Sequence, residues 1–411
     1  PPPPPPPPPP PFNTLRRPPT PTPTSNRRQR QMCIRDRMIV TGEASGDLHG
    51  AHVFREIKKL LPDIDCYGVG GTQMQQAGVD IQTNVSELSV VGLVEVLKHY
   101  PRLRKILSKT KDTLKLKKPD LLILIDSPDF NLPLAKAAKQ YGIKIMYYIS
   151  PQIWAWRKGR IKLIQKYVDM MAVVFPFEEK FYLDAGVPVE YVGHPLIKEA
   201  RATIEKNQFI TFTGLDSSKK LIGLFPGSRV SEIENNYPIL LGAANNLLQK
   251  RQDIQFITPI ATTLSDDLIK KYILETDIEV HTTSENIYNV INACDAIAAA
   301  SGTVTLQITL MQVPMLIVYK ISPITYRIFK RIVKFTYAGI ANVIAEKEIS
   351  REFIQADATS ENVSVELNKL LSDEQYISEM KSNMQDIRDI LGDKDGSATS
   401  ARLAVKLITD K

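Results

Sequence analysis

The sequence is poor in the residues that build disulfide frameworks and metal centres. Its 411 residues include three cysteines and five histidines. The cysteines (Cys33, Cys66 and Cys294) are odd in number and widely separated, which fits a reducing cytoplasm rather than a disulfide framework or a metal-binding motif. No apolar run approaches the roughly 18 residues of a spanning helix. We therefore expect a cytoplasmic protein with neither a metal ion nor another cofactor.

Most of the chain also lacks an excess of charge of either sign. The net charge is +7, but the first 37 residues contain seven arginines, no lysine and a single acid, Asp36. The rest of the chain carries 45 basic and 44 acidic residues, which nearly cancel. Because a nucleic-acid-binding domain needs a basic surface, we expect no nucleic-acid partner.

The first 37 residues form a compositionally distinct tail. It begins with eleven prolines and continues with arginine, threonine and more proline. Such a segment cannot bury a core, so we expect it to be extended or disordered. It is either a proline-rich docking arm or an artefact fused to a clipped start. We favour the artefact, because the first predicted strand, 38–41, looks several residues too short.

Strand and helix patterns alternate from residue 38 onward, over a length that exceeds one hydrophobic core of usual size. This alternation predicts an α/β fold with two doubly wound parallel sheets. The predicted strands are 38–41, 64–69, 120–125, 143–149, 170–174, 189–192, 220–225, 254–259, 278–281, 295–300 and 314–318. The predicted helices include 44–61, 101–117, 131–141, 229–250, 302–312 and 322–335. We place one domain at 38–199, a second at 200–355, and C-terminal helices that pack back on the body at 356–411.

Unusual polar residues follow several predicted strands at their carboxyl ends, the edge where open α/β sheets bind ligands. The first strand runs into a turn that contains Gly42, Glu43, Ala44, Ser45, Gly46 and Asp47. Free backbone N–H groups at such a turn suit an anionic or polyhydroxylated ligand. A tight structural connection between strand and helix is the alternative interpretation.

Asp126 is the candidate general base, because it directly follows the apolar strand 120–125. A carboxylate at this edge can accept a proton from a substrate hydroxyl. Capping the next helix is the alternative role, but Asp129 fits that role better because it leads into the helix. His194 lies in another loop, between a glycine and a proline, which favours contact with a ligand over a place in the core.

The second half of the chain contains a candidate anion-binding loop. Gly227, Ser228 and Arg229 follow a predicted strand and open a helix. Backbone donors, a hydroxyl and a guanidinium suit a diphosphate leaving group, on which charge builds as a bond breaks. An arginine in solvent is the alternative, although a cation is unfavourable at the positive end of a helix. Ser301-Gly302-Thr303 opens another helix in the same half and could complete the loop.

Two stretches, 88–105 and 324–335, combine apolar and basic residues in the manner of helices that lie on anionic membranes. Core helices with basic side chains at their rim give the same pattern, so both interpretations remain open. Trp154 and Trp156 follow a predicted strand, where they either line a binding site or cover the edge of the sheet.

Five motifs, taken together and in order, resemble those of the lipid-A-disaccharide synthases, which are GT-B glycosyltransferases of family 19. The resemblance extends from Met38 to the end of the chain. The motifs are Gly42-Glu43-Ala44-Ser45-Gly46-Asp47, Asp126-Ser127-Pro128-Asp129-Phe130-Asn131, Ser150-Pro151 with Trp154-Ala155-Trp156-Arg157, Gly193-His194-Pro195, and Pro226-Gly227-Ser228-Arg229.

The resemblance implies two Rossmann-like domains that face each other across a cleft, and an inverting hexosyltransferase. Such an enzyme condenses UDP-2,3-diacylglucosamine with 2,3-diacylglucosamine 1-phosphate (lipid X), releasing UDP and forming the β-1,6 disaccharide of lipid A. It would associate peripherally with the cytoplasmic face of the inner membrane, and the resemblance leaves room for a homodimer. Two rivals remain at this point: another UDP-sugar-dependent GT-B enzyme and a non-catalytic nucleotide-binding module.

Together with the loops described above, the resemblance assigns the site residues. The base falls on Asp126, with Glu43 and His194 as the next candidates. Donor contacts fall on Gly227, Ser228, Arg229, Ser301, Gly302, Thr303, Gln307 and Asn342. Acceptor and lipid contacts fall on Gly42, Ser45, Gly46, Asp47, Val91, Leu93, Trp154, Trp156 and Arg157.

The sequence departs from the family pattern in three motifs on the donor side. Gln307 stands where the family usually has a glutamate that holds the donor ribose, so a charge-assisted hydrogen bond is lost. Ile340-Ala341-Asn342 replaces Leu-Pro-Asn, and Arg351 replaces the proline of a Pro-Glu pair. These departures affect individual donor contacts rather than the reaction.

Overall fold

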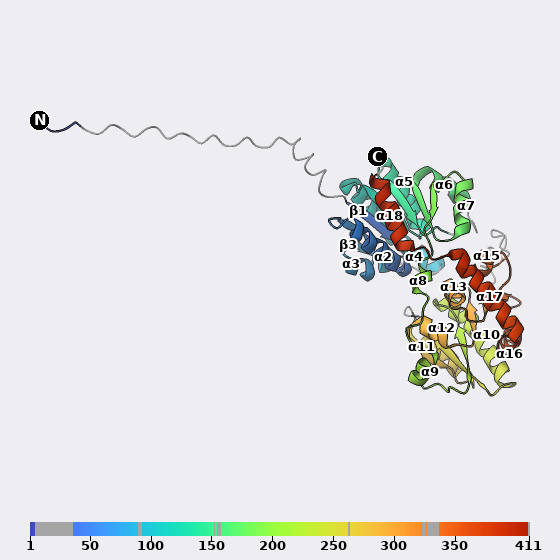
Figure 1. Ribbon diagram of the computed structural model, residues 1–411. Coiled ribbons are helices and arrows are strands. Elements are labelled where there is room, and N and C mark those ends of the chain that lie inside the picture. The colour runs from blue at the N-terminus through green and yellow to red at the C-terminus, as the bar shows by residue number, and fades with distance from the viewer. Residues whose placement is uncertain are drawn as a thin grey trace.

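Two parallel β-sheets form the framework of the protein, and Figure 1 shows the two units that are built around them. The computed structural model describes residues 1–4, 36–88, 93–151, 153, 158–261, 264–322, 326 and 337–409. Every strand pair recorded in these residues is parallel. The predicted α/β class with two doubly wound sheets is confirmed.

The first sheet has seven strands in the order β3-β2-β1-β4-β5-β6-β7. The strands are β1 (Arg37–Thr41), β2 (Cys66–Gly70), β3 (Asp80–Asn84), β4 (Leu121–Ile125), β5 (Lys144–Tyr148), β6 (Met170–Val173) and β7 (Val189–Tyr191). The strand order reverses between β1 and β4, which pair directly along their whole length. This is the topological switch point, where loops diverge and open α/β sheets bind their ligands.

The second sheet has six strands in the order β10-β9-β8-β11-β12-β13. The strands are β8 (Lys220–Phe225), β9 (Ile254–Pro259), β10 (His281–Thr283), β11 (Ala296–Ala300), β12 (Met315–Tyr319) and β13 (Glu352–Ile354). Its switch point lies between β8 and β11, where Phe225 pairs with Ala299. The segments that follow these two strands carry the predicted donor residues other than Asn342, which lies in α15 after β12.

Helices cover both faces of the first sheet, as its apolar pattern requires. Ile39 belongs to the core that includes Phe54 of α2, whereas its neighbour Val40 belongs to the core that includes Leu114 of α4 and Leu134 of α5. The helices of this unit are α2 (Ala44–Leu60), α3 (Thr72–Ala77), α4 (Leu93–Lys117), α5 (Pro128–Gln140), α6 (Ile161–Tyr167), α7 (Pro176–Asp184) and α8 (Leu196–Glu199), with 3-10 turns at Val85–Glu87 and Lys158–Arg160.

The helices of the second unit are α9 (Lys206–Thr213), α10 (Val230–Leu248), α11 (Asp266–Leu274), α12 (Ile287–Ala293), α13 (Thr303–Leu310) and α15 (Ile340–Ala345). Three further helices end the chain: α16 (Ser360–Ser372), α17 (Glu374–Leu391) and α18 (Gly396–Thr409). None of the helices in the described part of the chain is long and apolar enough to cross a membrane.

The C-terminal helices connect the two units. Helix α16 packs on α10 and α17 packs on α13, whereas α18 lies against α2 of the first unit, as Figure 1 shows. The link between α17 and α18 docks on the end of β7, where Lys394 Nζ donates to the carbonyl oxygen of Tyr191 at 3.1 Å. Asp395 in this link also forms an ion pair with Lys198 at 2.5 Å. The chain therefore crosses between the units a second time at its end.

Three short edge strands differ from the sequence prediction. Strands β3 and β13 were not predicted, and β10 forms at His281–Thr283 rather than at 278–281. All three lie at or next to a sheet edge and consist largely of polar or partly exposed residues. Because an edge strand needs only backbone pairing on one side, it leaves no apolar run in the sequence. The predicted helix at 322–335 falls almost wholly outside the described residues.

The predicted tail boundary at residue 37 is also wrong by at least one residue. Arg37 is the first residue of β1 and its side chain is 1% exposed. Its guanidinium donates to the carbonyl oxygen of Asp36 at 3.0 Å and to the carboxylate of Asp120 at 3.2 Å. The sequence counted this arginine with the basic tail, but the fold uses it to join β1 to the start of β4.

Candidate active site

The loops that follow β1 and β4 touch each other at the switch point of the first sheet. A Cβ atom added to Gly42 would lie 2.3 Å from Ser127 Oγ, a distance that no side chain tolerates. Gly46 is equally confined, because its Cβ would lie 1.9 Å from Thr41 Oγ1. Gly42 therefore lets the loop after β1 pack directly against the loop that carries Asp126, whereas Gly46 lets the first turn of α2 pack against Thr41 at the end of β1. Glu43 on the loop and Ser45 in the first turn of α2 are exposed.

Asp126 has a constrained backbone. It adopts a φ of 47° and is followed by Ser127 at 43°, both in the left-handed region that is uncommon for residues other than glycine. Its amide donates to the carbonyl oxygen of Tyr148 at 3.2 Å, and its own carbonyl oxygen accepts hydrogen bonds from Asn131 Nδ2 and the Tyr147 hydroxyl. Strained conformations that surrounding contacts enforce are concentrated at functional sites. These contacts fix the direction in which the carboxylate leaves the backbone.

The environment of Asp126 suits a base near neutral pH. Its pKa is raised to about 6, first by burial and second by the negative charge of Glu43, whereas a hydrogen bond from the Ser127 backbone opposes the rise. Glu43 is the N-cap residue of α2, but its side chain makes no capping hydrogen bond. Two carboxylates therefore lie at one sheet edge, and the inner one has a pKa close to the value that general base catalysis favours.

Asp47 has a structural role that the prediction of an acceptor contact did not include. Its carboxylate accepts hydrogen bonds from the backbone N–H groups of Gly71 (2.6 Å), Gln73 (2.9 Å) and Met74 (3.1 Å). These groups open α3, so Asp47 caps that helix from the neighbouring strand-helix unit. The side chain is 5% exposed and has no surface left for a substrate.

His194 is a weaker candidate for the base than Asp126. It is 8% exposed, and its ring lies 5.0 Å from that of Phe175. Burial and the neighbouring His49 lower its pKa to about 3. Its Nδ1 already accepts a hydrogen bond from the Leu196 backbone at 3.2 Å. The neutral imidazole thus carries its hydrogen on Nε2, and that nitrogen can donate but not accept.

The predicted anion-binding loop after β8 holds a carboxylate of the chain itself. Gly227 adopts a φ of 120°, which favours glycine. The Ser228 backbone N–H donates to Glu232 Oε2 at 2.8 Å, and the Arg229 guanidinium donates to Glu232 Oε1 at 3.1 Å. Both predicted donors therefore point at one position and already bind an anion there. Glu232 lies in the first turn of α10, and sequence reasoning missed it, although its spacing from Arg229 is that of a capping glutamate.

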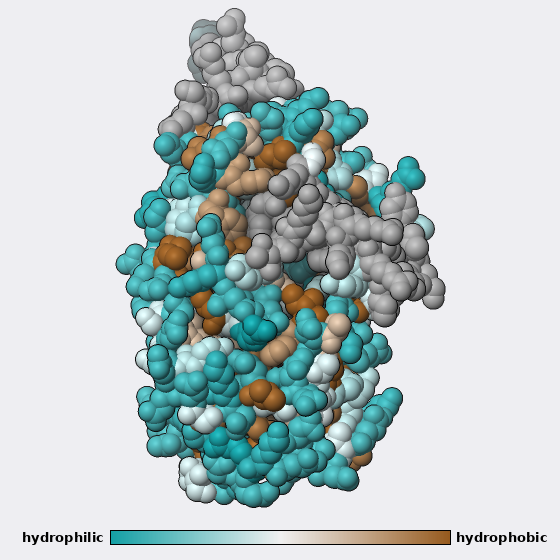
Figure 2. All heavy atoms as spheres, turned by 90° about the vertical axis from the view of Figure 1, so that its right-hand side faces the viewer, coloured by the Kyte–Doolittle hydropathy of each residue, from teal (hydrophilic) through white to brown (hydrophobic). Residues whose placement is uncertain are grey.

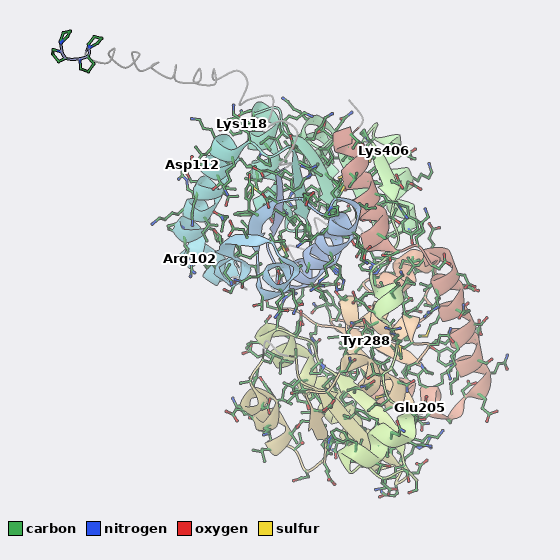
Figure 3. The ribbon with its side chains drawn as sticks, turned by 60° about the vertical axis from the view of Figure 1, so that its left-hand side comes forward. Arg102, Asp112, Lys118, Glu205, Tyr288 and Lys406 are labelled. Atoms are coloured by element: carbon green, nitrogen blue, oxygen red, sulfur yellow. The ribbon has the colours of Figure 1, made fainter. Side chains whose placement is uncertain are left out.

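The loop after β11 lies on the same edge of the second sheet. Gly302 and Thr303 are exposed, whereas the Ser301 hydroxyl donates to the carbonyl oxygen of Ala338 at 2.9 Å. Gln307 on α13 donates to the hydroxyl of Tyr288 at 3.1 Å. Figure 3 shows Tyr288 on the side of the second unit that lies toward the first. The sequence did not single out Tyr288, because only folding brings it to Gln307.

Asn342 is fully buried, and its side-chain amide hydrogen-bonds to other residues of the protein. Its amide donates to the carbonyl oxygen of Ser350 (2.8 Å) and to Glu352 Oε1 (2.7 Å), and it accepts from the backbone of Ile349 (2.9 Å). Glu352 in turn accepts from the N–H groups of Ala338 and Gly339. Asn342 therefore holds the segment that contacts Ser301, rather than presenting a free amide to the donor. The prediction that Asn342 contacts the donor directly did not include this role.

Several predicted acceptor and lipid contacts lie outside the described residues. These are Val91, Trp154, Trp156 and Arg157. Leu93 is the first residue of α4. Within the part of the chain that the structure describes, no group of three or more histidine, cysteine, aspartate or glutamate residues could hold a metal ion.

Comparison with known proteins agrees with this arrangement. A family model described as lipid-A-disaccharide synthetase matches residues 38–405. The lipid-A-disaccharide synthase of Geobacter sulfurreducens is 43% identical over 371 residues, which cover 90% of this chain and 97% of that protein. The chain belongs to the lipid-A-disaccharide synthase family. The family member from Coxiella burnetii, strain Dugway, is 38% identical over the same share of this chain and 98% of its own length.

The predicted identification as a glycosyltransferase of lipid A biosynthesis is thereby confirmed. Solved structures support the GT-B-like arrangement of the two sheets. The UDP-GlcNAc 2-epimerase of Neisseria meningitidis, whose structure contains UDP-GlcNAc, superposes with a TM-score of 0.62 over 92% of this chain and all of its own. Its 14% sequence identity shows a shared fold alone. The roles of individual residues in the family reaction depend on the geometry described above.

Proposed function

We propose that the protein transfers a 2,3-diacylglucosaminyl group from UDP to the 6-hydroxyl of 2,3-diacylglucosamine 1-phosphate, lipid X. Membership of the lipid-A-disaccharide synthase family supports both substrates. The observation that carries the mechanism is the Asp126 carboxylate, which lies at a ligand-binding sheet edge with a pKa of about 6 and a fixed backbone. The predicted anion-binding loop, which contains Gly227, Ser228 and Arg229, belongs to the second unit. Each unit therefore supplies part of the catalytic machinery.

Asp126 is the general base in this proposal. As the acceptor oxygen forms a bond to the anomeric carbon of the donor, its proton passes to the carboxylate. The bond between that carbon and the diphosphate oxygen breaks on the opposite side, and UDP leaves with the electron pair. One displacement of this kind inverts the anomeric configuration. Glu43 supports it by raising the pKa of Asp126, because two nearby carboxylates disfavour a second negative charge.

Arg229 and the Ser228 backbone receive the departing diphosphate. Charge on the leaving oxygen grows as the bond breaks, and a guanidinium beside a backbone donor stabilises that charge most when it is largest. Gln307 and Tyr288 form a hydrogen-bonded pair that would hold the ribose hydroxyls of the donor. The buried Asn342 and Glu352 act indirectly, by fixing the segment against which Ser301 lies.

The acylated substrates require access to a membrane surface, and we place the protein peripherally on the cytoplasmic face of the inner membrane. Helix α4 presents exposed basic side chains to solvent, and Figure 3 labels Arg102 within the helix and Lys118 directly after its last residue. A surface of this kind binds anionic lipid. On the face shown in Figure 2, hydrophobic residues are more frequent in the upper and central parts, and hydrophilic residues dominate the lower part.

The deciding experiment measures UDP release from UDP-2,3-diacylglucosamine with and without lipid X. We expect release only when lipid X is present, together with formation of the disaccharide 1-phosphate. Release with a different acceptor alone would indicate another GT-B transferase. Binding of the donor without release under any condition would indicate a nucleotide-binding module.

A further inference from the structure

The carboxylate of Glu232 is bound by the two groups that the proposed function assigns to the donor diphosphate. Its Oε2 accepts from the Ser228 backbone N–H at 2.8 Å, and its Oε1 accepts from the Arg229 guanidinium at 3.1 Å. A Cβ added to Gly227 would lie 2.4 Å from Oε2 and 2.6 Å from the Glu232 Cβ. The side chain therefore fills the space over the glycine that lets the backbone approach a phosphate.

The pair of charges lies at the ligand-binding edge of the sheet. The pKa of Tyr319, the last residue of β12, is raised by burial and by the charge of Glu232, and Arg229 opposes that rise. Both charges thus act on the carboxyl end of β12. The side chains of Arg229 and Glu232 are 54% and 26% exposed, so an anion from solvent can reach the guanidinium.

The backbone beneath Glu232 is held by contacts that do not involve its carboxylate. The buried Asn236 donates from Nδ2 to the Glu232 carbonyl oxygen at 2.9 Å. The same amide accepts at Oδ1 from the Lys320 backbone at 3.1 Å, which ties the first turn of α10 to the end of β12. The carboxylate can therefore swing away about its side-chain torsions without disturbing the helix or the loop.

We propose that Glu232 is an internal competitor for the diphosphate of the nucleotide sugar, a role that rests on the proposed function. In the empty site its carboxylate satisfies the Ser228 N–H and the Arg229 guanidinium and holds them in their binding geometry. When the diphosphate arrives, the carboxylate leaves both donors. If it stayed, its negative charge would repel the ligand. Glu232 therefore weakens the binding of every ligand that carries a diphosphate, including the product UDP, and favours product release.

A purely structural role for Glu232 makes a different prediction. A glutamate in the first turn of a helix also accepts backbone N–H groups as a cap. Loss of a cap destabilises the helix and the loop before it, so it weakens or leaves unchanged the binding of nucleotide. Loss of a competitor strengthens binding, and only for ligands with a diphosphate. The direction of the change separates the two roles.

The test compares the full-length protein with Glu232→Gln, which keeps the size and one hydrogen bond but removes the charge. Glu234→Gln is the matched control, because Glu234 is exposed on the same turn of α10 and has the same charge. UDP binding is measured by titration calorimetry, and uridine binding by ligand-observed NMR. We expect Glu232→Gln to bind UDP about tenfold more tightly and to show a correspondingly lower inhibition constant for UDP in turnover. We expect uridine affinity to stay unchanged in both variants.

The outcomes distinguish this inference from the proposed function. If the unaltered protein does not bind UDP, the proposed function fails. If it binds UDP but Glu232→Gln binds UDP no more tightly than Glu234→Gln does, the competitor role is wrong. A gain that extends equally to uridine also overturns it, because the diphosphate would not be involved. A thermal unfolding scan of each variant confirms that the compared proteins are folded.

Discussion

Hydrogen bonds to the backbone at Asp126 hold this residue in its conformation. Asn131 donates both to its carbonyl oxygen (2.7 Å) and to that of Ile125 (3.0 Å), and Tyr147 adds a third hydrogen bond at this corner. The left-handed backbone that these bonds enforce is one that aspartate and asparagine tolerate better than most residues. Replacement of Asp126 by asparagine therefore alters the charge while it leaves the corner intact.

Asp126→Asn should lower turnover by about a hundredfold or more, because the amide cannot accept the proton of the acceptor hydroxyl. Binding of UDP should be unchanged, since the donor loop lies in the other unit. Steady-state kinetics at saturating lipid X and calorimetry with UDP measure the two quantities. Near-normal turnover would move the base elsewhere, and Glu43 would be the next candidate.

The same variant should be more stable than the unaltered protein at pH 8. The folded state raises the pKa of Asp126 from 3.8 to about 6, so the stability contributed by this group is present below about pH 4 and is lost as the pH rises through about 6. Asparagine removes the buried charge, and the gain should be on the order of 2 kcal/mol at pH 8. Denaturant unfolding at pH 8 and pH 4 measures it. An equal difference at both pH values would show that charge burial is not the cause.

Glu43→Gln should shift the pH dependence of catalysis. If Asp126 is the base, kcat/KM falls as the pH drops through about 6. The negative charge of Glu43 contributes to that pKa, so its removal should move the acidic limb of the profile to lower pH. A pH-rate profile of both proteins provides the measurement. An unmoved limb combined with a large loss of rate would give Glu43 a direct role in the reaction.

Arg229→Ala should lower kcat more than it weakens donor binding, because the guanidinium meets a charge that grows as UDP departs. Loss of one such donor commonly costs about 3 kcal/mol of transition-state stabilisation. Separate measurement of kcat and of the dissociation constant for the donor tests the split. A variant that only binds UDP more weakly would show that Arg229 recognises the ground state.

At the scale of elements, the buried residues of α4 recur at helical spacing and lie on a different side of the helix from the exposed ones. Ile106, Thr110 and Leu114 are buried four residues apart, whereas Lys105 and Lys109 are exposed on another side. Burial in the core explains the positions of the three buried residues, but it does not explain why the exposed positions carry lysine. Lys109 Nζ donates to the carbonyl oxygen of Gln82 on β3 at 3.3 Å, yet both lysines keep their charge at the surface, which makes the helix a candidate for contact with lipid head groups.

Lys105→Gln combined with Lys109→Gln should weaken binding to vesicles that contain anionic phospholipid. Each basic residue near such a surface contributes about 1 kcal/mol, so the pair should lower the partition constant about tenfold or more. The matched control is Lys270→Gln with Lys271→Gln on α11, where both lysines are also exposed. Sedimentation with vesicles measures the effect. An equal loss in both double variants would assign it to overall charge and not to α4.

At the scale of the whole molecule, the ends of the chain behave differently. Helix α18 returns to the first unit and packs on α2, so the C-terminal end is part of the core. The N-terminal end enters the fold at Asp36 and Arg37, where two hydrogen bonds fix the start of β1. The boundary between tail and fold can therefore be tested to within two residues.

Removal of residues 1–35 should leave the thermal midpoint and turnover unchanged, because the composition of this segment gives it nothing to bury. Removal of residues 1–37 serves as the comparison. It deletes the buried Arg37 with its contact to Asp120, and should lower the midpoint by about 2 °C or more. Calorimetric scans and the UDP-release assay measure both proteins. Loss of activity in the shorter deletion would favour the docking arm instead.

The sequence by itself determined the two parallel sheets, the positions of their main strands along the chain and the sheet edge at which the candidate residues lie. These features follow from local patterns, since apolar runs become strands and the loops after parallel strands share one edge. It also singled out Asp126, which directly follows such a run, and Arg229, which follows another run after a short loop. Edge strands β3 and β13 were not predicted, and β10 was predicted at the wrong position, because polar edge strands have no such pattern.

Only the tertiary structure decided what each polar side chain does at that edge. Asp47 and Asp126 both follow strands that are neighbours in the first sheet, yet the carboxylate of Asp47 binds the backbone of α3, whereas Asp126 remains beside the candidate site. Asn342 was assigned to the donor and is buried among its own loop, while Glu232 was overlooked and occupies the anion position. The physical reason is that a carboxylate or an amide binds whichever donors or acceptors lie within about 3 Å. Which groups come within that distance depends on how segments that are far apart in the sequence pack together.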